Sequence, residues 1–185
     1  LVLLYYRHRD RRTAPTALFD ELPPVTVQLP MYNERLVARR IIEQACRLDY
    51  PREKLQIQVL DDSTDDTCRI ARRTVEQARR EGFTIEYLHR DDRTGYKAGA
   101  LANGMKTATG EYITIFDADF LPAPDILRRS IHYFTDPRVC VVQTRWAHIN
   151  EDYSLLTRLQ AVQLNVHFSV EQMGRMAGEH FLQFN

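Results

Sequence analysis

Glu111-Tyr112-Ile113-Thr114-Ile115-Phe116-Asp117-Ala118-Asp119 is the stretch around which the predicted fold is organised. Residues 112–116 are apolar, β-branched or aromatic, a composition typical of a buried strand. Pro122 and Pro124 follow closely and stop the strand, because proline cannot donate to a strand ladder. Asp117 and Asp119 therefore come directly after the carboxyl end of a strand, where open α/β sheets bind their ligands.

Two carboxylates this close together repel each other unless a cation neutralises them. Hard oxygen ligands suit Mg²⁺ or Mn²⁺, and such a metal would in turn hold phosphate oxygens. The alternative is that Asp117 and Asp119 only cap the following loop, because short D-x-D matches are frequent by chance. The rest of the chain has to decide between these two interpretations.

Strand-like and helix-like segments alternate along the chain. This order predicts an α/β fold with a Rossmann-like, mostly parallel sheet and helices on both faces. The sequence has no G-x-G-x-x-G motif, so a dinucleotide cofactor is not implied. Besides 112–116, the predicted strands are 25–29, 55–60, 84–88 and 139–143, and the predicted helices are about 34–48, 64–82, 97–102, 123–133 and 153–176.

The first and last predicted helices carry apolar stripes at helical spacing. Asn33 is expected to cap the first of them, whose acidic residue Glu34 favours the positive helix start. Its expected buried stripe is Leu36, Val37, Ile41, Ile42, Ala45 and Leu48. The stripe of the last helix is Leu155, Leu156, Leu159, Val162, Val166 and Val170.

The bulk composition is that of a globular domain. The chain has 185 residues, 44% of them hydrophobic, and a formal net charge of +0, which argues against a nucleic-acid-binding protein. Cys46, Cys68 and Cys140 are widely spaced and form no C-x-x-C motif. We therefore expect small core residues in a reducing compartment rather than metal ligands.

Six apolar or aromatic residues, 1–6, run directly into a basic cluster at 7–12. They are too few to cross a bilayer but match the last turns of a helix that does, with the basic cluster on the cytoplasmic side. An ordinary amphipathic segment is the alternative. We expect residues 1–12 to end a transmembrane helix, 13–24 to be a linker, and 25–185 to be a folded domain, truncated at its C-terminus, on the cytoplasmic side of the membrane.

Acidic and basic side chains converge on one edge of the predicted sheet, because all carboxyl ends of parallel strands lie there. Together with a cation they would make a site for a nucleotide diphosphate. Asp61 or Asp62 could accept hydrogen bonds from a base or ribose, and Tyr32 could support a base ring. The residues expected at this edge are Pro30, Tyr32, Glu34, Asp61, Asp62, Arg93, Lys97, Asp117 and Asp119.

Four motifs in order, at 29–34, 59–65, 95–101 and 116–119, resemble those of family-2 inverting glycosyltransferases. The resemblance covers about residues 23–185 and is greatest to the processive membrane-bound branch, which includes cellulose synthases and mannan and glucan synthase-like enzymes. It implies the GT-A fold. It also implies transfer of a sugar, with inversion, from a nucleotide sugar of the UDP-glucose or GDP-mannose class to a glycan or lipid acceptor.

The resemblance also implies roles for individual residues. Asp61 or Asp62 would hold the uracil or ribose end of the donor, and Asp117 would lie near it. Asp119 would ligate Mg²⁺ or Mn²⁺ on the diphosphate. The basic residues implied to approach the phosphates or brace the carboxylates are Arg93 and Lys97.

The sequence departs from the family at the catalytic base. The base in the family is an aspartate of a T-E-D motif, which a Q-x-x-R-W motif follows, and neither motif is present here. Residues 143–146 are one residue too short for the second motif, and Glu151-Asp152 follows asparagine instead of threonine. We therefore expect the chain to bind donor and metal but to be inactive or severely impaired. Residues that could still border the sugar pocket are Gln143, Trp146 and His148, although Trp146 could equally be packed.

Two other classes of protein place acids at strand ends. A nucleotidyltransferase usually has a glycine-rich loop after the first strand, and Pro30-Met31-Tyr32-Asn33-Glu34 has no glycine. A receiver-like signalling module, which is not an enzyme, places its lysine after the last strand. In this chain Lys97 precedes the D-x-D strand. Both alternatives explain the motifs less well.

Overall fold

The structure, a computed structural model, describes residues 14–172, 174 and 175. The chain divides into two compact units, one of residues 17–135 and the other of the remaining residues on either side. Residues 1–12, predicted to end a transmembrane helix, lie outside the described residues. Within the described part of the chain, no helix is long and apolar enough to cross a membrane.

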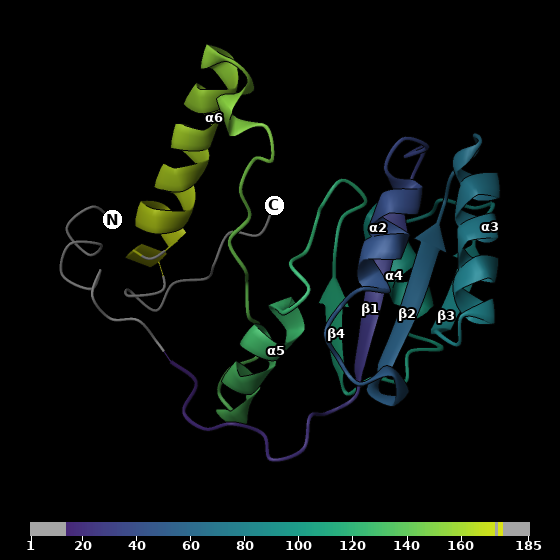
Figure 1. Cartoon of the computed structure of the whole chain (residues 1–185), viewed down its shortest axis with the longest axis horizontal. Helices are drawn as coiled ribbons and strands as arrows, with labels where there is room; N and C mark the ends of the chain where they lie inside the picture. The colour runs from purple at the N-terminus through teal and green to yellow at the C-terminus, as the bar shows by residue number, and fades with distance from the viewer. Residues whose placement is uncertain (1–13, 173, 176–185) are drawn as a thin grey trace. The chain divides into compact units, whose positions relative to one another are not determined.

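Four parallel strands form the sheet of the first unit, in the order β3-β2-β1-β4 (Figure 1). The strands are β1 (Val25–Met31), β2 (Leu55–Asp61), β3 (Thr84–His89) and β4 (Tyr112–Ile115). The register pairs Met31 with Asp61 and Asp61 with His89, so three strands end level with one another. The predicted parallel α/β sheet is confirmed. β4 was expected to be buried, but it lies at one end of this strand order and is only partly buried.

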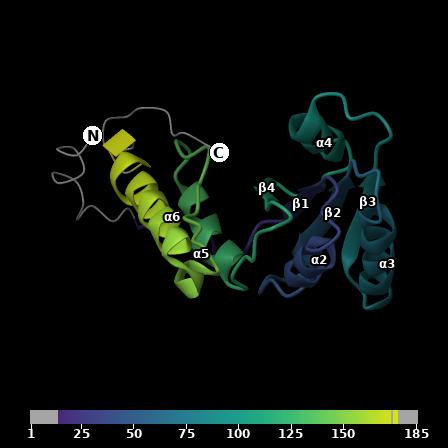
Figure 2. The same cartoon turned by 90° about the horizontal axis from the view of Figure 1, so that it is seen from above.

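Helices cover both faces of the sheet, as predicted. Helices α2 (Ala38–Ala45) and α3 (Thr67–Arg80) pack on one face, and α4 (Tyr96–Gly104) lies on the other (Figure 2). The face under α2 and α3 is apolar and forms the core of the unit. Fully buried members of that core include Val27, Leu29, Ile41, Ile42, Ile57 and Val59.

The face under α4 is polar and nevertheless buried. Thr26, Gln28, Gln56 and Gln58 are between 0% and 4% exposed. Gln28 Nε2 donates to Gln58 Oε1 at 3.0 Å, and Gln58 Nε2 donates to the carbonyl of Gly104 at 2.9 Å. A Cβ on Gly104 would lie 2.6 Å from Gln28 Nε2, so glycine is what lets α4 approach the sheet this closely. Alternating polar residues in β1 and β2 therefore do not mark a solvent-facing side.

Helix α2 begins later than predicted, and Asn33 does not cap it. Asn33 has φ of 56°, in the left-handed region that asparagine tolerates, and its Oδ1 accepts a hydrogen bond from the backbone N–H of Thr64 at 3.0 Å. Residues 35–37 form a turn before the helix. Leu36 is 87% exposed, so its expected place in the buried stripe is wrong, whereas Ile41, Ile42, Ala45 and Leu48 are buried as predicted.

Of the two remaining predicted helices, the one at 123–133 is shorter than predicted, and the one at 153–176 is helical over most of its described length. Helix α5 (Ile126–Ile131) continues into a 3₁₀ turn at His132–Thr135, and further 3₁₀ turns lie at Arg52–Lys54 and Glu151–Tyr153. In the second unit, α6 (Leu155–Val166) runs into a π-helical segment at His167–Gln172. Ser154 caps α6 by accepting a hydrogen bond from the N–H of Thr157 at 3.2 Å.

One prediction for the second unit is wrong. Residues 139–143 were expected to be a strand but are irregular, because β-propensity produces a strand only where a partner strand satisfies the backbone. The apolar stripe predicted for the last helix falls on α6 and is largely exposed. Its exposed members, each between 54% and 75% exposed, are Leu155, Leu156, Leu159, Val162 and Val166.

Candidate functional site

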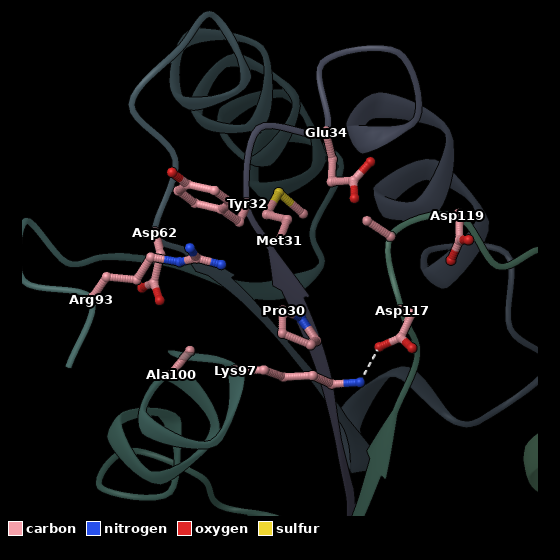
Figure 3. Close-up of a pocket in the computed structure, with 11 residues that line it drawn as sticks. Pro30, Met31, Tyr32, Glu34, Asp62, Arg93, Lys97, Ala100, Asp117 and Asp119 are labelled. Atoms are coloured by element: carbon pink, nitrogen blue, oxygen red, sulfur yellow. Dashed lines mark hydrogen bonds and ion pairs between the residues drawn. The ribbon is translucent and has the colours of Figure 1, made fainter. Parts of the chain in front are cut away.

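A pocket of about 340 Å³ opens where β1, β2 and β4 end and where α4 begins (Figure 3). Of the residues predicted for the strand edge, all except Asp61 line it. Its eleven lining residues are Pro30, Met31, Tyr32, Glu34, Asp62, Arg93, Lys97, Ala100, Asp117, Ala118 and Asp119.

The loops that follow β1 and β2 are tied together beside the pocket. The N–H of Asp62 donates to the carbonyl of Met31 at 3.1 Å, which extends the parallel ladder by one bond. The N–H of Asn33 donates to Ser63 Oγ at 2.8 Å, and the Asn33 side chain accepts from Thr64. These reciprocal bonds fix the chain on either side of Tyr32 and Asp62, so the pocket wall is preorganised.

The structure separates the two adjacent aspartates that the sequence leaves equivalent. Asp61 is fully buried; its Oδ1 accepts from the N–H of Ser63 at 2.9 Å, and its Oδ2 accepts from the hydroxyl of Tyr87 at 2.6 Å. Burial and the Asp61 carboxylate together raise the pKa of Tyr87, which keeps the phenol protonated as the donor. Asp61 thus holds the turn after β2, and Asp62 faces the pocket.

Cys68 and His89 lie beside Asp61, with potential ligand atoms of all three within 4.8 Å of one another. Each group already has protein partners. Cys68 Sγ donates to the carbonyl of Ser63 at 2.9 Å, and burial raises the pKa of the thiol. His89 Nδ1 lies 3.8 Å from Asp61 Oδ2, while its Nε2 lies 3.4 Å from Asp91 Oδ1. The cluster therefore supports the turn after β2. Cys46 and Cys68 are partly buried, whereas Cys140 is exposed, so its expected place in the core is wrong.

Arg90 is an important residue near the pocket that the sequence analysis did not identify. Its Nε donates to Asp62 Oδ1 at 2.8 Å, and its Nη2 donates to the other carboxylate oxygen. The hydrogen bonds to Asp62 raise the pKa of Arg90. The same guanidinium donates to the carbonyls of Thr94 and Tyr96 at 3.2 and 3.1 Å. Because the register pairs Asp61 with His89, Arg90, the residue that follows β3, lies level with Asp62, and this level ending of the two strands is the signal that could have revealed it.

The two cations that line the pocket differ in their partners. Lys97 Nζ, from α4, pairs with Asp117 Oδ1, as the dashed line in Figure 3 shows. The Arg93 side chain has no hydrogen-bond or ion-pair partner among the described residues, and its Nε is buried. Its guanidinium carbon lies 3.3 Å from the centre of the Tyr32 ring and 5.1 Å from that of Tyr96. The charge of Arg93 is thus the one available to an anionic ligand.

Asp119 is a carboxylate that a divalent cation could use. Its main-chain carbonyl accepts from Arg40 Nη2 at 2.9 Å, which holds the backbone, while its exposed carboxylate has no partner in the part of the chain that the structure describes. A free carboxylate oxygen is the ligand that Mg²⁺ and Mn²⁺ prefer, and these ions keep further positions for water and phosphate oxygens. The donor set at Asp117 and Asp119 therefore fits such a metal.

The three residues expected at a sugar pocket belong to the second unit. Trp146 contacts His148 with ring centres 5.6 Å apart and Phe168 with ring centres 6.0 Å apart, both edge to face. Trp146 and His148 also line a second pocket of about 560 Å³ beside α6. Packing accounts for these contacts of Trp146, and the sugar-contact role of Gln143, Trp146 and His148 remains a prediction.

A glycosyltransferase is the class of protein that this fold and pocket define. Residues 26–183 match the family described as Glycosyl transferase family 2, and the chain belongs to that family. It is also similar, with a TM-score of 0.65 and 34% identity, to the mannosyltransferase PcManGT from Pyrobaculum calidifontis, solved in complex with GDP-Man and Mn²⁺. That match covers 76% of this chain and 43% of the other. The predicted family and GT-A fold are confirmed.

Plant mannosyltransferases are among the curated relatives. The chain is 42% identical over 197 residues to glucomannan 4-beta-mannosyltransferase 2 of Arabidopsis thaliana, covering 100% of this chain and 37% of the relative. It is 45% identical over 170 residues to a probable glucomannan 4-beta-mannosyltransferase 7 of Oryza sativa subsp. japonica, covering 89% of this chain and 29% of the relative. The chain thus spans about a third of the length of these relatives, and the nucleotidyltransferase and receiver-like alternatives are set aside.

Proposed function

We propose that this chain binds a nucleotide sugar, GDP-mannose in the first place, for inverting mannosyl transfer to a hydroxyl of a β-linked glycan. The observation that carries the proposal is that one pocket contains both a carboxylate and a cation without charged partners among the described residues. Asp119 offers a free carboxylate for a metal, and Arg93 offers a free positive charge. A metal ion and a positive charge would each stabilise a bound diphosphate. GDP-mannose is favoured over UDP-glucose because the relatives and the solved enzyme named above are mannosyltransferases.

In the proposed reaction the acceptor hydroxyl oxygen bonds to the anomeric carbon of the donor while the bond from that carbon to the diphosphate breaks. The hydroxyl proton passes to a base, for which we assign no residue of this sequence, and GDP departs. Mg²⁺ or Mn²⁺, held by Asp119 with Asp117 nearby, would neutralise the departing diphosphate. Arg93 would add a fixed positive charge at the same place. Asp62 would accept a hydrogen bond from the ribose or base.

The proposal extends to the surroundings of the domain. Residues 1–12 are proposed as the end of a transmembrane helix with its basic cluster on the cytoplasmic side, and 13–24 as the linker to a domain that faces the cytoplasm. A lipid-linked glycan is the second acceptor class that fits a site beside a membrane. Gln143, Trp146 and His148 would contact the sugar or the acceptor.

Calorimetric titration of the purified chain tests the donor site. GDP and UDP are each titrated with and without Mn²⁺ or Mg²⁺, into the unaltered chain and into Asp119→Asn. We expect metal-dependent binding of GDP, weaker binding of UDP, and loss of the metal dependence in Asp119→Asn, because the amide carries no negative charge for the cation.

Asp20→Asn is the matched control, since Asp20 is exposed in the same unit and does not line the pocket. It should bind GDP as the unaltered chain does. Metal-independent GDP binding, or equal binding by Asp119→Asn and the unaltered chain, would contradict the metal site. Preference for UDP would contradict GDP-mannose as the donor while keeping the nucleotide site.

A further inference from the structure

Tyr96 has a backbone conformation that calls for an explanation. Its φ is +50°, in the left-handed region, where a bulky aromatic residue is a genuine outlier. Gly95 before it also has positive φ, of 75°, so the chain turns sharply into α4. The Tyr96 side chain is 68% exposed and therefore gains little from burial in the core. Such strain persists where the surroundings enforce it, and it is frequent at functional sites.

The described ring contact of Tyr96 is with Arg93. The Arg93 guanidinium carbon lies 5.1 Å from the Tyr96 ring centre and 3.3 Å from that of Tyr32, so both aromatic rings lie within cation–π distance of one cation. Tyr32 follows β1 and Tyr96 begins α4, so the two rings come from different elements of the fold. Figure 3 shows Arg93 alongside Tyr32 and Asp62.

Hydrogen bonds from the protein hold the backbone of this loop but leave the charge of Arg93 unpaired. Arg90 donates to the carbonyls of Thr94 and Tyr96, and the N–H of Tyr96 donates to the carbonyl of Arg93 at 2.9 Å. The Arg93 side chain itself has only ring contacts in the described residues, and its buried Nε lacks an acceptor. A ring quadrupole attracts a cation without neutralising it, so the positive charge is oriented and kept for a ligand.

We propose that Tyr32 and Tyr96 are positioning residues that hold Arg93 as the diphosphate-binding cation of the pocket. We call this arrangement of Tyr32, Arg93 and Tyr96 the tyrosine cradle. The inference rests on the proposed function, because the ligand is the diphosphate of the nucleotide sugar. It adds Tyr96 to the site, a residue that lies in the motif at 95–101 but does not line the pocket, and it gives Tyr32 a role through Arg93.

The test compares Tyr96→Leu with Tyr96→Phe by titration with GDP and Mn²⁺. Phenylalanine keeps an aromatic face over Arg93, whereas leucine removes it at similar volume. Neither substitute is branched at Cβ, so the backbone strain at the positive φ of residue 96 should be the same in both variants. We expect Tyr96→Leu to bind GDP about 5- to 30-fold more weakly, the range that a partly desolvated cation–π contact implies. Tyr96→Phe should stay within about twofold of the unaltered chain, and Tyr32→Leu and Tyr32→Phe should differ in the same direction.

A double-substitution cycle separates positioning from a purely structural effect. Arg93→Gln alone should weaken GDP binding, and adding Tyr96→Leu to Arg93→Gln should cause no further loss. An equal loss on either background, or no difference between the leucine and phenylalanine variants, would overturn the cradle. The exposed Tyr153→Leu should bind normally. If the unaltered chain binds GDP with Mn²⁺ and the cradle variants bind equally well, only this inference fails; if it does not bind GDP at all, the proposed function fails with it.

Discussion

Arg90 donates hydrogen bonds to both carboxylate oxygens of Asp62 and, with the same guanidinium, to two carbonyls of the loop that carries Arg93. The Asp62 side chain is 4% exposed and that of Arg90 16%, so solvent screens this pair only weakly. Arg90→Lys keeps the charge but loses the fork of donors. We expect the free energy of unfolding in urea to fall by about 2 to 4 kcal/mol, because a buried carboxylate is left partly unpaired.

The chain offers a matched control for this change. Arg138 donates to Asp136 with the same two atoms, Nε to Oδ1 at 3.0 Å and Nη2 to Oδ2 at 2.8 Å, but its side chain is 87% exposed. Arg138→Lys should leave the urea midpoint nearly unchanged, since solvent screens exposed pairs. If both substitutions shift the midpoint equally, burial of the Arg90–Asp62 pair has no part in its stabilising effect.

Lys97 and Arg93 should contribute unequally to nucleotide binding. Lys97 is already paired with Asp117, whereas Arg93 has no anionic partner in the described residues. Arg93→Ala is expected to weaken GDP binding in the presence of Mn²⁺ by about tenfold or more, the effect of a charge-assisted hydrogen bond. Lys97→Ala should cause a clearly smaller loss in the same titration, and the exposed Lys106→Ala none. A larger loss for Lys97→Ala would reverse the assignment of the phosphate contact.

Two glycines should tolerate alanine very differently. A Cβ on Gly110 would lie 2.2 Å from the backbone nitrogen of Thr26, an atom that cannot move aside within the sheet. Gly110→Ala should therefore lower the free energy of unfolding by about 3 kcal/mol. Gly82 follows the C-cap of α3 with φ of +85° and has open space around it, so Gly82→Ala should cost only about 1 kcal/mol of left-handed strain. Urea denaturation of both variants measures the difference, and equal losses would refute the close approach at Gly110.

Tyr50 should make the domain sensitive to alkali. Burial raises its pKa to about 12 from the ordinary 10.0, and its hydroxyl donates to the carbonyl of Pro23 at 2.6 Å. Because the folded pKa is the higher one, this contribution to stability is complete below about pH 10 and is lost as the pH rises toward 12. Tyr50→Phe should lose about 1 kcal/mol at neutral pH and should show a shallower alkaline decline.

The control for Tyr50→Phe is Tyr153→Phe, at a side chain that is 84% exposed. The two variants are compared by urea unfolding from about pH 8 to about pH 12. This range extends about two pH units on either side of the ordinary tyrosine pKa. Tyr153→Phe should keep the alkaline decline of the unaltered chain. A decline in Tyr50→Phe as steep as in the unaltered chain would mean that other groups cause it.

Local sequence patterns predicted those parts of the fold and site that depend on strand positions. Once 25–29, 55–60 and 112–116 are read as parallel strands, the residues that follow them must meet at one edge, and Asp62, Asp117 and Asp119 do so. Chain order and periodicity are sufficient for that conclusion, because the direction of parallel strands leaves no other arrangement. Individual side-chain partners are not fixed in this way.

The features that sequence reasoning missed all depend on residues distant in the sequence. Asn33 looked like a helix cap, but Thr64 and Ser63, about thirty residues further on, bind it instead. Residues 139–143 have the composition of a strand, yet a strand needs a partner that composition does not identify. The role of Arg90 was missed for the same reason, because that role depends on its simultaneous hydrogen bonds to Asp62 and to the loop that carries Arg93.

The glutamines under α4 fix the position of this helix along the strands of the sheet. Apolar packing is non-directional, so a helix resting on leucines can slide by a fraction of a turn at little cost. Gln58 instead donates to the carbonyl of Gly104 and to Thr107 Oγ1, and a slide of about 1.5 Å, one residue, would break both bonds together. Lys97 is therefore held at one height above the strand ends.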